Sequence, residues 1–244
     1  MQQPTTLPAY ERLDGPVPVF HPTNMEDRAR RLRGLLQAGM QELSTILDVE
    51  PPELHALLIA DEDWREAPRE NNKPYPPGLP YFTQSVSPPA LVIPEELSPV
   101  FQPRTEALLP LTLWHELTHA FLLQRALVRT PIWLREFVPQ AAAVAVARRT
   151  GLPLGKHFSW MDEAGFPVRE FGRTADADEQ MAFQNLLLVL GNQALEGFGD
   201  GFLGKLVRAL WDEEDVVDEV RAEELLADAL GTGRRKWLQS RPEF

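Results

Sequence analysis

After Arg104 the spacing of apolar residues becomes helical for nearly all of the remaining chain. Before that point, short apolar runs are separated by proline-rich stretches. The helical periodicity predicts helices over residues 106–128, 132–149, 175–194, 200–212, 215–230 and 233–239. Gly151 and Gly231 stand where helices are expected to stop. We therefore expect an α+β protein: a small mixed sheet packed on helices in the first half, and a mostly helical second half.

The first half also divides into elements. Residues 1–22 are rich in proline and lack periodicity, which predicts an extended arm. Thr23 and Glu26 have the spacing of a capping box, followed by an apolar stripe that predicts a helix. The stripe consists of Leu32, Leu35, Leu36, Met40, Leu43, Ile46 and Leu47. Apolar runs at 54–59, 81–86 and 90–93 predict strands, and prolines at 88, 89 and 94 favour a place at an edge or margin of the sheet for the last of them.

The sequence predicts one domain over residues 1–244, made of an arm (1–22), a sheet-containing lobe (23–128) and a helical lobe (129–244). The turn at 128–131 is the expected seam between the two lobes. We find no internal repeat and no long low-complexity linker along the chain.

Composition excludes several classes of protein. The formal net charge is −12, whereas binding to nucleic acid requires a positive surface. The longest apolar stretch, around 141–147, is too short to cross a bilayer. The chain has no cysteine, and its first residues lack the pattern of a secretory signal, so we expect a cytoplasmic protein. The expected partner is a peptide or protein substrate, and the sequence gives no indication of oligomeric state.

The segment His115-Glu116-Leu117-Thr118-His119 carries the most specific chemistry. Two histidines four residues apart on a helix project from one face, so both imidazoles could bind one zinc ion at about 2.0–2.1 Å. Glu116 lies about 100° further around the helix, where it need not bind the metal but could act as general base on a water molecule. The alternative is a helix whose histidines make ordinary hydrogen bonds in the core.

A hydrolytic zinc site needs a third protein ligand and one open position. Glu136 lies in the next predicted helix, in the segment Trp133-Leu134-Arg135-Glu136, and it is our candidate for that ligand. Its alternative roles are an ion-pair partner for Arg135 and a plain surface charge.

These residues resemble the gluzincin metallopeptidases, in particular the peptidase MA-like group, in which H-E-x-x-H is followed by W-L-x-E-G and a downstream A-x-Y. The resemblance implies a zincin-like fold, with zinc held by His115, His119 and Glu136 and with Glu116 as the base. Three positions depart from the family pattern. Phe137 replaces the glycine and should place bulk near the site, and Pro139, at the alanine position, should kink its helix. Ala141 stands at the tyrosine position.

Peptide hydrolysis also requires a hydrogen-bond donor for the oxyanion. Tyr10, Tyr75 and Tyr81 are the only tyrosines and all lie in the first half, while His157 is the only histidine after the motif. We consider His157 either as this donor or as a surface histidine, and we expect His21 and His55 to be structural or exposed. The strand at 81–86 is either an ordinary strand or the sheet edge that pairs with an extended substrate.

Two functions follow from these residues. The first is zinc-dependent peptide-bond hydrolysis, by an endopeptidase or a hydrolase of small peptides. The second is a zinc-binding pseudopeptidase or a peptide-binding module without turnover. An aminopeptidase is disfavoured, because the chain has no G-x-M-E-N signature for gripping a substrate amine.

Overall fold

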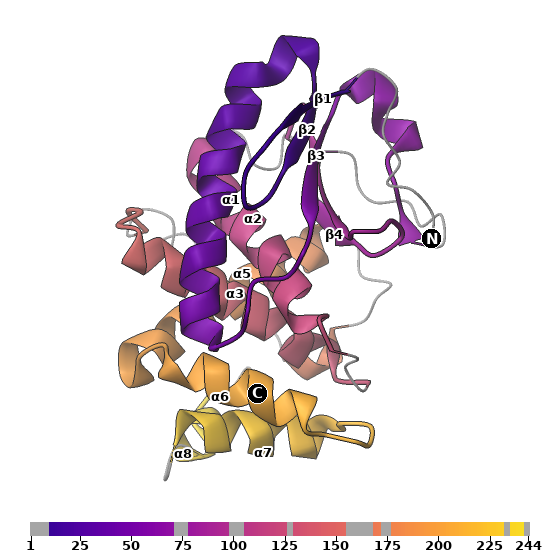
Figure 1. The fold of residues 1–244 in the computed structure, drawn as a ribbon. Coiled ribbons are helices and arrows are strands. Elements are labelled where there is room, and N and C mark those ends of the chain that lie inside the picture. Colours follow the sequence, from indigo (N-terminus) through magenta and orange to yellow (C-terminus); the bar gives the residue numbers. More distant parts are fainter. Residues whose placement is uncertain are drawn as a thin grey trace. The chain divides into compact units, whose positions relative to one another are not determined.

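The computed structural model (Figure 1) describes residues 10–70, 78–97, 105–125, 129–154, 168–171, 177–231 and 235–241. The chain forms two compact units. The first contains residues 1–41 and 50–121, and the second contains residues 42–49 and 122–244. One boundary between the units falls at 121/122, and the segment 42–49 joins the second unit.

A five-stranded mixed sheet forms the centre of the first unit, with strand order β1-β2-β3-β5-β4. The strands are β1 (Tyr10–Leu13), β2 (Val19–Pro22), β3 (His55–Ile59), β4 (Tyr81–Thr83) and β5 (Ala90–Pro94). The β2–β3 and β3–β5 pairs are parallel, whereas β1–β2 and β4–β5 are antiparallel. Every residue of β3 and β5 is buried, which agrees with their apolar sequences and their interior positions.

Two predictions about the sheet are wrong. Part of the predicted extended arm forms the strands β1 and β2, which pair from Tyr10 opposite Pro22 to Leu13 opposite Val19. The strand β5 is not an edge: it lies between β3 and β4, and its proline at position 94 is the last residue of the strand. A proline at a strand terminus removes only one terminal donor, so it is compatible with an interior position.

The helix α1 (Glu26–Leu47) carries the predicted apolar stripe, of which all members except Leu35 are buried. The predicted capping box is wrong, because Thr23–Met25 forms a 3-10 turn (η1) and no side chain caps it. The exposed side of the helix carries ion pairs, in which Arg30 lies 2.6 Å from Glu26 and 3.4 Å from Asp27. In Figure 1, α1 is the long indigo helix.

The helix α2 (Thr105–Leu122) crosses α1 closely within the first unit, because a glycine leaves room for a tryptophan. A Cβ atom on Gly39 would lie 2.4 Å from Cδ1 of Trp114, far inside van der Waals contact. The indole of Trp114 is buried, and its Nε1 donates to the carbonyl of Leu35 at 3.0 Å. This crossing positions the residue immediately before His115.

The second unit is helical. Besides the last part of α1, its helices are α3 (Ile132–Arg149), α5 (Ala177–Phe198), α6 (Gly201–Trp211), α7 (Glu219–Leu230) and α8 (Arg235–Gln239), with the 3-10 turn η5 at Val168–Glu170. The predicted bounds of α3 are confirmed, whereas the helix predicted at 106–128 ends at Leu122 and the one predicted at 215–230 begins at Glu219. In the first unit, a further 3-10 turn (η2) spans Asp61–Glu66.

Local signals set the ends of these helices. Asp218 caps α7 by accepting a hydrogen bond from the backbone N–H of Arg221 at 2.8 Å. Gly151 and Gly231 have positive φ values of 73° and 104° just after α3 and α7, which confirms both as stops.

The three departures from the family pattern lie inside α3. Phe137 is fully buried and its ring lies 6.4 Å from that of Phe202 on α6, so its bulk enters the core of the second unit. Pro139 is buried within the helix, which continues as one element through Arg149. The effect of Phe137 on the space near the site stays a prediction.

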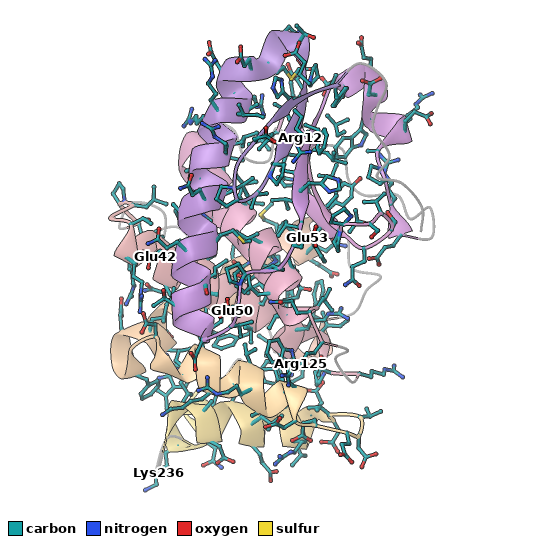
Figure 2. All side chains as sticks on the ribbon, viewed as in Figure 1. Arg12, Glu42, Glu50, Glu53, Arg125 and Lys236 are labelled. Atoms are coloured by element: carbon teal, nitrogen blue, oxygen red, sulfur yellow. The ribbon has the colours of Figure 1, made fainter. Side chains whose placement is uncertain are left out.

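Charged side chains also tie the second unit together. Arg149, at the end of α3, contacts Asp200 at 2.8 Å and Glu42 at 3.4 Å, and these bonds raise the pKa of the guanidinium. Glu42 is labelled in Figure 2 and belongs to the part of α1 that joins this unit. No helix in the described part of the chain has both the length and the apolar character that crossing a bilayer requires.

Candidate metal centre

His115 and His119 project from one face of α2, as their spacing predicts. The helix around them is largely buried: Leu113, Leu117 and Thr118 have no exposed surface, and His115 is 7% exposed. The hydroxyl of Thr118 donates to the carbonyl of Trp114 at 2.7 Å, so this polar group needs no other partner. The apolar sequence around the histidines therefore places both imidazoles on a rigid, packed helix.

The two imidazoles face each other through their Nε2 atoms. These atoms are 3.2 Å apart, and the ring planes are inclined by 79°. Two nitrogens that each lie about 2.0–2.1 Å from one ion and 3.2 Å from each other subtend about 100° at that ion. This angle is close to the tetrahedral value of about 109° that zinc sites adopt. The spacing thus fits two ligands of one tetrahedral metal.

Glu116 lies beside the pair, and its two carboxylate oxygens have different surroundings. Oε2 accepts a hydrogen bond from the backbone N–H of Phe82, on the edge strand β4, at 3.0 Å. Oε1 lies 3.9 Å from Nε2 of His115. The side chain is 17% exposed. The strand therefore holds one oxygen and leaves the other on the side of the imidazoles.

Glu136 belongs to α3 in the second unit, where its side chain is 17% exposed. Its Oε2 accepts a hydrogen bond from Nε2 of Gln184, on α5, at 3.3 Å. Its Oε1 is 3.9 Å from Nε of Arg135, which is at the outer limit of an ion pair. Of the alternative roles proposed from the sequence, the ion pair with Arg135 is present at this distance, whereas a plain surface charge does not describe a carboxylate that is only 17% exposed.

The described residues offer two imidazoles, on His115 and His119 in the first unit, and one carboxylate, on Glu136 in the second, as candidate ligands of a metal ion. Two imidazole nitrogens and one carboxylate oxygen are a donor set that hydrolytic zinc enzymes use. Three ligands also leave one coordination position open, as catalysis requires. The residues present therefore fit zinc, and their individual roles as ligands stay a prediction.

The other histidines of the first unit are structural. His21 is buried and its Nδ1 lies 2.8 Å from the carbonyl of Pro22. His55 is buried on β3 with its ring edge against Phe20, and burial lowers its pKa. These positions confirm that neither histidine belongs to the candidate metal group.

Two of the tyrosines considered as oxyanion donors have their hydroxyls bonded to other groups. The hydroxyl of Tyr10 donates to Asp63 at 3.0 Å and accepts from the N–H of Ala60 at 2.9 Å, and burial raises its pKa to about 12. The hydroxyl of Tyr81 donates to the carbonyl of Pro68 at 3.0 Å. Tyr75 and His157 lie outside the described residues.

Sequence reasoning missed two groups that contact the candidate site residues. The donor to Glu116 is a backbone N–H of β4. Every residue except proline has this donor, so the amino-acid type at that position does not indicate it. Gln184 approaches Glu136 from a helix 48 residues further along the chain. The apolar periodicity of α5 indicates its buried face but does not single out a polar residue beside that face.

Comparison with solved structures finds a similar fold in LTA4 hydrolase from yeast, solved in complex with bestatin. The TM-score is 0.60 and the sequence identity is 14%, and the match covers 95% of this chain and 38% of that chain. This chain thus spans well under half of the hydrolase, and at this identity the likeness concerns the fold alone. No family model and no curated protein matches the sequence. The α+β class predicted from the sequence is confirmed at this coarse level.

Proposed function

We propose that this protein is a zinc-dependent hydrolase that cleaves peptide bonds, with His115, His119 and Glu136 as zinc ligands and Glu116 as general base. The observation that carries the proposal is the pair of Nε2 atoms 3.2 Å apart on α2, with a carboxylate oxygen 3.9 Å from one of them. A pair of core histidines would not require this neighbouring carboxylate. A metal hydrolase requires both.

Zinc, when bound, supplies Lewis acidity that makes water reactive near neutral pH. The protein's own contribution is a placed proton acceptor. Because the N–H of Phe82 engages Oε2 of Glu116, the carboxylate is held in one orientation, with Oε1 on the side of the imidazoles. Oε1 would take the proton of the attacking water and pass it to the leaving amine.

The proposed substrate is an extended peptide, and the position of β4 supports this choice. This strand is the edge of the sheet, and it contacts the proposed base through its backbone. An extended peptide can add to such an edge through main-chain hydrogen bonds, which brings its backbone next to Glu116. The overall likeness to a hydrolase fold is consistent with this proposal.

The test combines metal content with turnover. Purified protein should contain about one zinc per chain and should cleave members of a broad library of internally quenched peptides. The Glu116→Gln variant should retain zinc but lose hydrolysis by at least about 100-fold, the usual contribution of a general base. Glu53→Gln is the matched control, because Glu53 is an exposed carboxylate of the same unit, labelled in Figure 2. Protein without zinc, or cleavage that survives Glu116→Gln, would refute the proposal.

A second function is favoured by one observation. Both tyrosine hydroxyls in the described residues are bonded elsewhere, to Asp63 and Ala60 in one case and to Pro68 in the other. A zinc-binding module that holds a peptide without turnover would need no oxyanion donor. Stoichiometric zinc together with saturable peptide binding, but no cleavage of any library member, would establish this alternative.

A further inference from the structure

Two glutamine side chains are hydrogen-bonded in series, and the second of them donates to the carboxylate of Glu136. Gln140 follows Glu136 by one turn of α3, and its Nε2 donates to Oε1 of Gln184, on α5. Nε2 of Gln184 then donates to Oε2 of Glu136 at 3.3 Å. All three side chains are partly buried and belong to the second unit.

The carboxylate of Glu136 determines which way the two hydrogen bonds run. An ionised carboxylate can only accept hydrogen bonds, so Gln184 must turn its amide nitrogen toward Glu136. Its amide oxygen then faces Gln140, which must donate to it. The orientations of both amides therefore follow from the charge of Glu136 rather than from a free choice between two flipped forms.

Helix packing holds Gln184 in place independently of this carboxylate. Further along the same two helices, a Cβ atom on Gly191 would lie only 2.9 Å from Cα of Ala141, so the backbones approach closely. Beyond that point Arg148 donates to the side chain of Asn192 at 2.6 Å. Because these contacts fix the register of α5 against α3, the amide of Gln184 is brought to Glu136 by the fold itself.

We infer that Gln184 is a positioning residue for the metal-ligating carboxylate of Glu136, an inference that rests on the proposed zinc site. By engaging Oε2, it restricts rotation of the carboxylate. Gln140 acts one step further away, because it orients the amide of Gln184. Hydrogen-bonding partners of this kind around metal ligands commonly account for about 10- to 100-fold in metal affinity.

The experiment measures zinc affinity by competition with a chromophoric chelator, for the wild type and for Gln184→Met, which keeps the length of the side chain but removes the donor. Affinity should fall about 10- to 100-fold, and Gln140→Met should show a smaller loss in the same direction. Gln37→Met is the matched control on an exposed helix position and should bind zinc like the wild type.

A second readout separates positioning from general stability. The visible absorption spectrum of the cobalt-loaded protein reports the ligand geometry, and it should change in Gln184→Met while the unfolding midpoint of the metal-free protein stays near that of the wild type. Hydrogen-bonding partners of metal ligands contribute at least about tenfold in affinity. If the wild type binds zinc tightly and the zinc affinities of both glutamine variants lie within about twofold of it, the inference is therefore wrong, while the zinc site stands. If Gln184→Met does not fold, Gln140→Met decides alone. If the wild type binds no zinc, the proposed function itself fails.

Discussion

Replacing Gly39 with alanine should destabilise the protein, although alanine is the better helix former. The added Cβ would lie 2.4 Å from Cδ1 and 2.8 Å from Nε1 of Trp114, and 3.1 Å from Cδ2 of Leu117. The indole is 2% exposed and cannot swing into solvent. It must instead shift within the core, away from the carbonyl of Leu35 to which it donates.

The expected change in the free energy of unfolding for Gly39→Ala is the sum of three contributions. Overpacking a core position costs about 1–3 kcal/mol, and loss of the indole hydrogen bond costs about 1 kcal/mol. The higher helix propensity of alanine returns about 1 kcal/mol. The free energy of unfolding should therefore decrease by about 1–3 kcal/mol. Urea denaturation followed by far-ultraviolet circular dichroism measures this change.

The same helix provides the control. A Cβ atom on Gly34 would meet no atom of the described residues within 4 Å beyond its own stretch of helix, so Gly34→Ala should gain about 0.5–1 kcal/mol. Combining Gly39→Ala with Trp114→Phe, which replaces the indole by a smaller ring, should recover much of the loss, because contacting residues are not additive. The reasoning is refuted if Gly39→Ala is as stable as Gly34→Ala, or if its cost is unchanged beside phenylalanine.

Three further predictions concern stability. Burial, with a smaller contribution from the charge of Arg12, lowers the pKa of His55 below 6.5, so the folded protein binds fewer protons there than the unfolded chain. As the pH falls below about 6.5, the free energy of unfolding should therefore decrease more steeply in the wild type than in His55→Gln. The two slopes should differ by at most about 1.4 kcal/mol per pH unit, and equal slopes in urea denaturation at several pH values would contradict this. Trp133→Phe removes the 2.6 Å bond from the indole to Glu219 and should cost about 1.5–3 kcal/mol, measured by urea denaturation, whereas an unchanged midpoint would show that the bond contributes nothing. Asp218→Ala removes the cap of α7 and should cost about 1 kcal/mol in the same assay, with Asp218→Asn close to the wild type.

The parts of this fold that the sequence predicts best are those determined locally. An i, i+4 pair on a helix must share a face, so the juxtaposition of His115 and His119 needs no knowledge of the rest of the chain. The bounds of α3 are equally local, since Pro131 precedes the helix and Gly151 follows its last turn.

Non-local pairing explains what the sequence does not predict. The hairpin of β1 and β2 was missed because β1 has only partly buried and exposed residues, so it lacks the alternation of a half-buried strand. The strand β5 is interior because the chain forms β4 first, at the edge of the sheet, and then places β5 between β3 and β4. The prolines near β5 cannot indicate this order. The contact of Gln184 with Glu136 likewise arises only when two helices pack in a given register.

The bond from Phe82 to Glu116 has a consequence for how this protein can vary. Since the donor is the peptide group, every residue type except proline supplies it, whatever its side chain. The side chain of Phe82 is buried, so core packing limits its size and polarity, while the anchor of the carboxylate persists in any residue that keeps its N–H. The orientation of Glu116 thus depends on the backbone of this strand rather than on the identity of its side chains, and related chains should keep an apolar residue at position 82 but exclude proline there.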